Sequence, residues 1–415
     1  MNIANNTPTL GKTLMARLDE AAAFSRPGPG VTRLFCSEEH RQVLELIGDW
    51  MRQAGLEPSL DASGNLVGRN PRAIAGEKTL ILGSHQDTVT EGGKYDGMLG
   101  VALPLMALQE IKDQGVELPY GVEVVAFGDE EGTRFQSTLI GSRALAGTLD
   151  DESLAALDAE GISVAEAIQA FGGDPAVIPD IARSPEQVLG FVEVHIEQGP
   201  VLESRDHAVG VVTALTGIER QRITVTGKAG HAGTTPMAGR RDALVGAAEM
   251  VVEANRLLQA TDNFVGVVGK LEVRPNAVNV IPSEVTFTLE LRSPDGNTRA
   301  RGREEILSAF RRLAEARGLE VAIERTYAAE AVACAEWLVE ALEEACDGAG
   351  EPAERMFSGA GHDGLAMHDL TDIGMLFVRC RDGLSHHPDE SITAEDAERA
   401  TRVMMQFLSA MESRV

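Results

Sequence analysis

Residues 79–101, TLILGSHQDTVTEGGKYDGMLGV, decide how the rest of the chain is organised. The stretch opens with a short apolar run, residues 79–83, which is typical of a buried strand. A loop follows that holds His85, Asp87 and Asp96, and its glycines allow the backbone to turn back sharply. An imidazole and two carboxylates at the carboxyl end of an α/β strand indicate a metal site or a general-base site. The alternative is that these side chains only cap turns.

The composition predicts an acidic globular protein. The chain has 415 residues, of which 43% are hydrophobic, so it is long enough for two or three domains with buried cores. Its formal net charge of −27 argues against nucleic acid or an anionic membrane as a partner. The four cysteines are scattered and form no CxxC pair, which fits a reducing cytoplasm. No signal-peptide pattern or membrane-length apolar run is found, so we expect a cytoplasmic protein.

Strands and helices alternate in the first half of the chain and again near its end. This alternation predicts an α/β domain with three layers. We expect strands at residues 66–68, 79–83, 122–127, 190–194 and 374–378, and helices at residues 37–54, 101–114, 139–145, 153–171, 336–348 and 394–411.

A second pattern interrupts this domain. The order strand, helix, strand, strand, helix, strand is the signature of a ferredoxin-like domain. Its elements are expected at residues 222–226, 242–258, 264–273, 284–292, 298–317 and 319–327. We therefore predict one domain from residues 1–214 and 329–415, with a smaller domain at residues 215–328 inserted into it.

Polar residues follow other predicted strands of the larger domain. Glu130 and Glu131 follow one strand, His195 follows the next, and His386 follows the last. Each has a structural alternative, a solvated turn or a satisfied core histidine. Ligands in open α/β sheets nevertheless bind outside the carboxyl ends of the strands. That edge would bring together five side chains: His85, Asp96, Glu131, His195 and His386.

Five such ligands suit two divalent ions that share one carboxylate. Imidazole and carboxylate groups favour zinc, manganese or cobalt over calcium or magnesium. A neighbouring carboxylate that binds no metal is needed as the general base, and Glu130 is the candidate. Asp87 is placed to orient the imidazole of His85.

Seven motifs stand in order between about residue 84 and residue 390: GSHQDTV…GGKYDGMLGV, FGDEEGTRF, VEVHIEQGPVLE, GHAGTTPM, PNAVNVIP, SGAGHDG and GLSHHPDE. Together they resemble the M20 metallopeptidase-like amidohydrolases, whose motifs follow the same order. The branch is that of N-carbamoyl-L-amino-acid hydrolases, allantoate amidohydrolases and ureidoglycolate amidohydrolases.

This resemblance implies a role for each matching residue of the larger domain. His85 and either His195 or His386 would be terminal metal ligands, Asp96 the bridging ligand and Glu131 a further ligand. Glu130 would be the general acid and base. A second histidine, His387, follows His386, and we assign the ligand to His386 because it follows a serine as in the family.

The resemblance also implies that the inserted domain is a lid that closes over the substrate and forms a dimer contact. His231 would reach the partner subunit's active site and polarise the scissile carbonyl, although Gly230 stands before it where many relatives have asparagine. Gln198, Asn279 and Arg292 match substrate-binding positions, and Gly361 lies in a loop that offers backbone donors. Arg292 also alternates with the apolar residues of its strand, and a guanidinium suits a substrate carboxylate.

Residues 359–364 fit the pattern GxGxxG, but only a short piece of strand precedes them, so we reject a dinucleotide site. The ligands and the resemblance together imply a dimeric two-metal amidohydrolase that cleaves a ureido bond of a small carboxylate. We favour allantoate, because KYDG, FGDEEGTRFQSTLIGS and MLFVRCRDG look more like allantoate amidohydrolases. The alternatives are an N-carbamoyl-L-amino-acid hydrolase, a dipeptidase or aminopeptidase of the same superfamily, and a metal-binding scaffold without activity.

Overall fold

The structure is a computed structural model that describes residues 9–414. The chain forms two compact units. The second unit is Ala214–Ala333, and the first unit consists of the described residues on either side of it. The sequence predicts an inserted domain at residues 215–328, and the second unit covers Ala214–Ala333.

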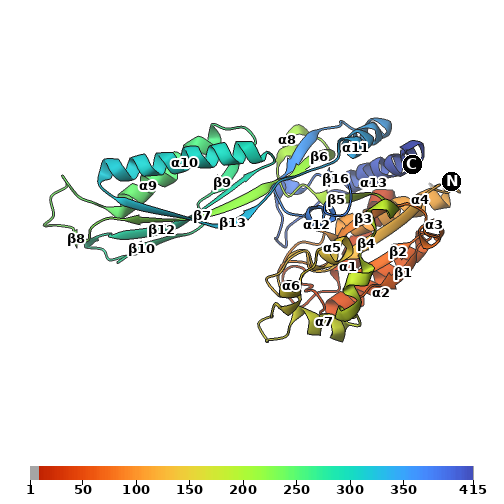
Figure 1. Ribbon diagram of the computed structural model, residues 1–415. Helices are drawn as coiled ribbons and strands as arrows, with labels where there is room; N and C mark the ends of the chain where they lie inside the picture. Colours follow the sequence, from red (N-terminus) through yellow and green to blue (C-terminus); the bar gives the residue numbers. More distant parts are fainter. Residues whose placement is uncertain (1–8, 415) are drawn as a thin grey trace, which may run out of the picture. The chain divides into compact units, whose positions relative to one another are not determined.

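A mixed sheet of nine strands organises the first unit (Figure 1). Its order is β1-β2-β4-β3-β5-β16-β6-β14, and β15 pairs with β6. Four neighbouring strands, β4, β3, β5 and β16, run parallel, so their carboxyl ends meet at one edge. The strands are β1 (Glu57–Leu60), β2 (Leu66–Arg69), β3 (Thr79–His85), β4 (Gly121–Phe127), β5 (Val188–Ile196), β6 (Val209–Leu215), β14 (Val332–Ala333), β15 (Arg355–Ser358) and β16 (Ile373–Val378).

Every residue of β3 and β4 is buried, as expected for strands that are covered on both faces. The helix α4 contacts β3, β4 and β5, and α13 from the end of the chain packs against α1, α4 and α11. The C-terminal part of the chain thus completes the domain that the N-terminal part begins. The helices are α1 (Leu10–Ala22), α2 (Glu38–Gln53), α3 (Pro71–Ile74), α4 (Met98–Asp113), α5 (Ile140–Ala146), α6 (Asp151–Ala155), α7 (Val164–Phe171), α8 (Val201–Arg205), α11 (Glu336–Ala349), α12 (Gly364–Met367) and α13 (Ala394–Ala410).

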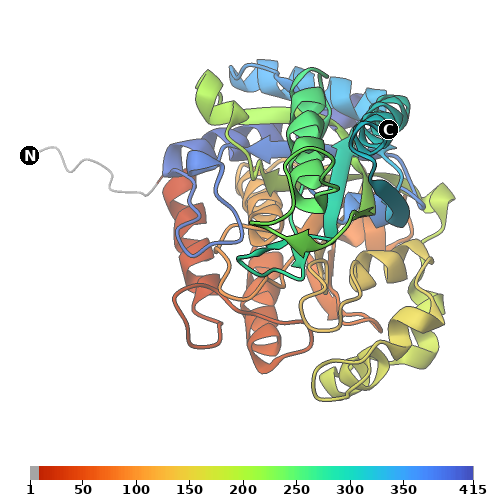
Figure 2. The same cartoon turned by 90° about the vertical axis from the view of Figure 1, so that its left-hand side faces the viewer.

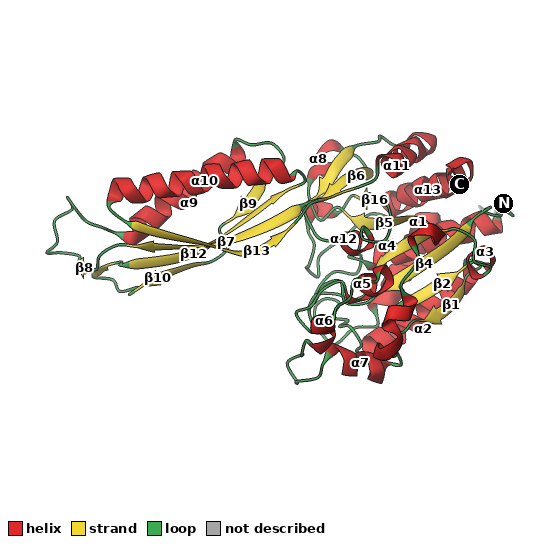
Figure 3. Ribbon diagram, in the orientation of Figure 1, coloured by secondary structure: helices red, strands yellow, loops and turns green. Residues whose placement is uncertain are grey.

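An antiparallel sheet and two helices form the second unit, and this confirms the predicted ferredoxin-like pattern. The sheet order is β10-β12-β7-β13, with β9 also on β12, and α9 and α10 lie side by side (Figures 2 and 3). The core between helices and sheet includes Ile223, Phe287 and Phe310. The elements are β7 (Gly217–Thr226), β8 (Gly230–His231), α9 (Ala243–Gln259), β9 (Val265–Val267), β10 (Leu271–Arg274), β11 (Val280–Ile281), β12 (Glu284–Ser293), α10 (Gly296–Arg317) and β13 (Glu320–Ala329).

Two predicted elements are each divided in the structure. The prediction of a single helix at residues 153–171 is wrong, because a turn with Gly161 at positive φ separates α6 from α7. Ser163 then starts α7 with a capping box: its hydroxyl accepts from the Glu166 N–H, and the Glu166 carboxylate accepts from the Ser163 N–H. The single strand expected at residues 264–273 is also wrong, because Gly269 lies between β9 and β10 and a glycine weakens a strand.

The helix α1 and the strands β1 and β6 were not predicted from the sequence. Among residues 9–414, no helix has the length and apolar character needed to cross a membrane.

Candidate active site

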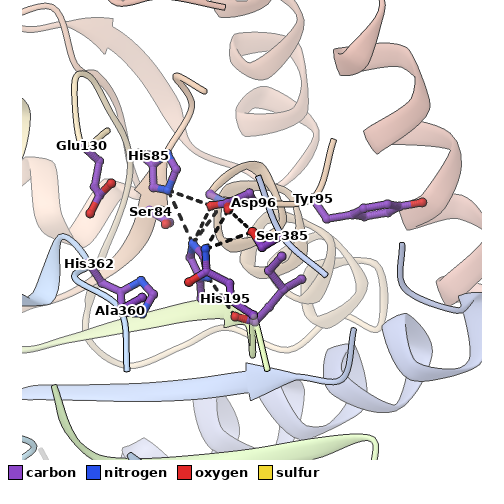
Figure 4. Close-up of polar contacts among 12 residues, drawn as sticks. Ser84, His85, Tyr95, Asp96, Glu130, His195, Ala360, His362 and Ser385 are labelled. Carbon is purple, nitrogen blue, oxygen red and sulfur yellow. Dashed lines mark hydrogen bonds and ion pairs between the residues drawn. The ribbon is translucent and has the colours of Figure 1, made fainter. Parts of the chain in front are cut away.

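Two buried histidines from neighbouring parallel strands face one carboxylate. His85 is the last residue of β3. The sequence predicted that His195 follows its strand, but in the structure His195 lies inside β5. Asp96 comes from the loop before α4 and lies near both rings (Figure 4). Its Oδ1 is 3.3 Å from Nε2 of His85 and 3.1 Å from Nε2 of His195. All three residues are at most 5% exposed.

The backbone fixes which nitrogen of each ring faces Asp96. Nδ1 of His85 lies 3.0 Å from the carbonyl oxygen of Asp87, and Nδ1 of His195 lies 3.0 Å from that of Ile196. A carbonyl oxygen can only accept, so Nδ1 carries a proton, and Nε2 is the nitrogen that faces Asp96 and would bind a metal once it is deprotonated. The two Nε2 atoms are 3.5 Å apart, and acceptors this close to a carboxylate repel one another unless a proton or cation lies among them. The residues therefore fit a metal ion.

A second group forms around the other oxygen of Asp96. Nε2 of His386 lies 3.4 Å from Oδ2 of Asp96 and 3.5 Å from Oε1 of Glu131. In each group, one ligand atom from every residue lies within 4.8 Å of the others. Asp96 belongs to both groups and turns a different oxygen to each, as a carboxylate shared by two ions does. We call His85, Asp96 and His195 the first triad, and Asp96, Glu131 and His386 the second triad.

Glu130 lies beside the first triad. With His85 and Glu131 it forms a further group of ligand-type atoms within 4.8 Å of one another. Asp87 holds the turn that carries both glutamates, because its carboxylate accepts from the N–H groups of Glu130 at 3.1 Å and Glu131 at 3.3 Å. The sequence assigns Asp87 to orienting His85, and in the structure the backbone carbonyl of Asp87, not its carboxylate, holds Nδ1 of that ring.

Burial raises the pKa of both glutamates at this site, Glu130 and Glu131. The pKa of Glu130 is well above its usual range, first because of burial and also because of Glu131 and other nearby acids. Burial raises the pKa of Glu131 from 4.5 to about 8. Buried acids that resist ionisation in the free protein provide a site where a divalent cation replaces protons.

Metal binding is therefore expected to release protons. In the metal-free protein Glu131 is largely protonated at pH 7, since its pKa is about 8, and a metal ion needs the carboxylate. The apparent metal affinity should rise from pH 6 to pH 8. Conversely, the uncharged Glu131 favours the metal-free fold at low pH, and this contribution is lost as the pH rises through about 8.

Calorimetric titration of the stripped protein at pH 7, in buffers of different ionisation enthalpy, measures this release. The binding heat should depend on the buffer in wild-type protein and less so in Glu131→Gln. Identical heats in all buffers would contradict the protonated state of Glu131.

Three side chains that the sequence did not assign as metal ligands surround this cluster. Gln198 donates from Nε2 to Oδ2 of Asp96 at 2.8 Å and to Oγ of Ser385 at 3.1 Å. Ser385 itself donates to Oδ2 of Asp96 at 2.6 Å. The ring of His362, next to Gly361, packs against that of His195 with 4.4 Å between centroids (Figure 4). Gln198 and Gly361 were predicted to bind substrate. No role was predicted for Ser385 or His362, although both stand in the motifs GLSHHPDE and SGAGHDG.

The other predicted substrate residues lie in the second unit. His231 in β8 and Asn279 just before β11 are neighbours, since the Ala232 N–H donates to the Asn279 carbonyl at 3.0 Å. Arg292 points away from the apolar side of β12, as predicted, while Leu291 is buried. Its Nε donates to Oε1 of Glu290 at 2.8 Å, and the other oxygen of Glu290 accepts from Arg220 at 2.6 Å.

The turn before α4 leaves no room for a side chain at Gly97. Its φ is +65°, and a Cβ there would lie 2.4 Å from ring atoms of His85. Gly97→Ala should therefore displace the imidazole and lower metal affinity by about 10–100-fold, the size expected when the support of a ligand is lost. Gly76→Ala is the matched control, because Gly76 also has positive φ (+84°) but no atom within 4 Å of the added Cβ. Equal metal affinity in both variants would contradict this account.

Comparison with known proteins identifies the family. The model of the peptidase family M20/M25/M40 matches residues 81–410. The chain belongs to this family. It is 41% identical to an N-carbamoyl-L-amino acid amidohydrolase of Geobacillus stearothermophilus, over 95% of this chain and 97% of that protein. It is 38% identical to an allantoate deiminase of Arabidopsis thaliana, over 95% of this chain and 81% of that protein.

A solved structure agrees with the M20 assignment. A hydantoinase/carbamoylase family amidase from Burkholderia multivorans superposes with a TM-score of 0.90 at 34% identity, covering 96% of this chain and 97% of that chain. These relatives confirm the predicted branch of the M20 family and the predicted fold. The chain is a hydrolase of carbon–nitrogen bonds other than peptide bonds, and its histidine and carboxylate cluster is consistent with the metal dependence of M20 proteins.

Proposed function

We propose that this M20 protein cleaves the ureido carbon–nitrogen bond of a small carboxylate, with allantoate as its preferred substrate. The observation that carries the proposal is the placement of Asp96, whose two oxygens face two triads of metal ligands beside the partly buried Glu130. The relatives named for N-carbamoyl-L-amino acids and for allantoate support ureido chemistry.

Five residues would hold two divalent ions, zinc, manganese or cobalt: His85, Asp96, Glu131, His195 and His386. Such ions, when bound, polarise a carbonyl group and acidify water. The chain's own residues then determine the direction of proton transfer.

Glu130 is proposed as the general base and acid. Its carboxylate takes a proton from the attacking water and holds it until the C–N bond breaks. Water adds its oxygen to the ureido carbon, Glu130 passes the proton to the leaving nitrogen, and the C–N bond breaks. The carbamate product decomposes to ammonia and carbon dioxide.

Substrate recognition is assigned to groups of both units. We propose that the Arg292 guanidinium pairs with the substrate carboxylate, and that Gln198, Asn279 and the backbone at Gly361 bind the remaining polar atoms. His231 is proposed to stabilise the oxygen that becomes negative during attack. We further propose that the second unit is a lid and dimerisation domain and that His231 acts on the partner subunit.

Mixing two inactive variants tests the action of His231 across a dimer. His231→Ala and Glu130→Gln should each be inactive alone, and mixed dimers should recover activity, since one of their two sites would hold both native groups. Separately tagged chains allow mixed dimers to be isolated and their ammonia release measured. Isolated mixed dimers without activity would contradict the proposal that His231 acts on the partner subunit.

The substrate is tested by measuring product release from allantoate, a panel of N-carbamoyl-L-amino acids and a dipeptide with the same metal-loaded protein. The highest kcat/KM on allantoate supports the proposal. The 41% identical relative is named for N-carbamoyl-L-amino acids. A preference for these compounds would replace allantoate as the proposed substrate but keep the ureido chemistry. Cleavage of the dipeptide alone would refute the ureido proposal.

A further inference from the structure

Glu390 joins the two loops that carry Asp96 and His386. It is 3% exposed, and its Oε1 accepts from the backbone N–H groups of Tyr95 and Asp96, each at 3.0 Å. Gly93 makes room for this carboxylate, because a Cβ at residue 93 would lie 2.1 Å from Oε1. The Asp96 loop is therefore shaped around Glu390, a residue from the far end of the chain.

The other carboxylate oxygen of Glu390 contacts the side chain of Ser385, in the loop that carries His386. This oxygen, Oε2, lies 3.0 Å from Oγ of Ser385, and the single proton of that hydroxyl can be donated either to Oε2 or to Oδ2 of Asp96 at 2.6 Å. Ser385 directly precedes His386. Glu390 and Ser385 thus link the His386 loop to both the backbone and the carboxylate of Asp96.

The two triads depend on this link to different degrees. His85 and His195 lie in buried strands of the central sheet, so the sheet itself holds two of the three residues of the first triad, and only Asp96 depends on the loop. The side chain of His386 is half exposed and its backbone has φ of +55°, a conformation that non-glycine residues rarely adopt. A half-exposed ligand on such a loop needs an anchor if its nitrogen is to stay near Asp96 and Glu131.

We propose that Glu390 is a positioning residue for the second triad and that it secures the binding of the second metal ion. The inference rests on the proposed two-ion function. Glu390 touches neither substrate nor metal in this account, and it acts by fixing the distance between the His386 loop and Asp96.

The test is a metal titration of stripped protein, followed by direct metal analysis. Wild-type protein should bind two Co²⁺ ions per chain. Glu390→Ala should bind the second ion about 10–100-fold more weakly, as expected when an outer support of a ligand is removed. It should weaken the first ion much less, because the sheet holds both histidines of the first triad. Glu390→Gln should restore much of this affinity, because the amide oxygen accepts from the same N–H groups and the NH₂ donates to Ser385.

Glu351→Ala is the matched control. Glu351 is also a buried glutamate, 8% exposed, but it pairs with Arg399 at 2.7 Å away from both triads. The Glu351→Ala variant should bind two ions with wild-type affinity, even if its melting temperature is lower than that of the wild-type protein. If Glu390→Ala does not fold, Ser385→Ala removes the hydroxyl that contacts both Glu390 and Asp96, and it should weaken the second ion in the same direction.

The outcomes separate this inference from the proposed function. Two ions of wild-type affinity in Glu390→Ala, or in Ser385→Ala where that variant replaces it, would overturn the role of Glu390 and leave the two-ion site intact. Equal weakening of both ions would overturn it as well, since the sheet holds two of the three residues of the first triad. Fewer than two ions in wild-type protein would overturn the two-ion proposal, and the inference with it.

Discussion

Replacing Glu130 by glutamine is expected to lower kcat by about 10²–10⁴-fold, the usual contribution of a general acid–base group. Metal content and KM should stay near wild type, because Glu130 belongs to neither proposed ligand triad. Glutamine keeps the size and the hydrogen-bonding ability of the side chain but cannot take a proton from water. Steady-state kinetics and metal analysis on the same sample give both readouts.

The neighbouring residue supplies the control for this variant. Glu131→Gln changes the same kind of side chain one residue away, but Glu131 belongs to the second triad. It should therefore lose metal as well as activity. Retained turnover in Glu130→Gln, or metal loss as large as in Glu131→Gln, would contradict the assigned role.

Asp96→Asn should abolish binding of both ions and reduce ammonia release to background. The aspartate presents Oδ1 to His85 and His195 and Oδ2 to His386. An amide lacks the negative charge and has only one acceptor, so one triad would face an NH₂ group. The affinity loss should exceed the 10–100-fold that loss of an outer partner produces, because a shared ligand is removed.

Asp396→Asn is the control for loss of a buried aspartate. Asp396 is 1% exposed and pairs with Arg379 at 2.7 Å, outside the metal cluster. This variant should be less stable but should bind metal normally. Binding of two ions by Asp96→Asn would show that Asp96 does not bridge them.

The sequence predicted the grouping of the candidate ligands because parallel strands end at one edge of a sheet. That rule alone places the regions of His85, Glu131 and His195 near one another, and the structure brings these side chains together. Their roles as metal ligands stay predictions. The ferredoxin-like unit could also be predicted from the sequence, because strands such as β12 alternate buried and partly buried residues along their length.

The anchors around the site could not be read from sequence patterns. Glu390 and Asp96 are 294 residues apart, and a contact between two loops leaves no periodic signal. The helix α1 could have been found, because Thr9 caps it and Leu14 and Leu18 recur one turn apart on its buried side. The break between α6 and α7 depends on the Ser163 cap, a local hydrogen bond that overrides the helical pattern on either side.

Metal titration combined with activity measurements tests whether the Asp96 cluster holds two catalytic metal ions. The protein is stripped of metal, reloaded stepwise with Mn²⁺ or Zn²⁺, and each sample is analysed for bound metal and for ammonia release from its best ureido substrate. The account predicts no activity without metal and full activity at two ions per chain. Full activity in stripped protein, or a maximum reached with no ion bound at the Asp96 cluster, would contradict it.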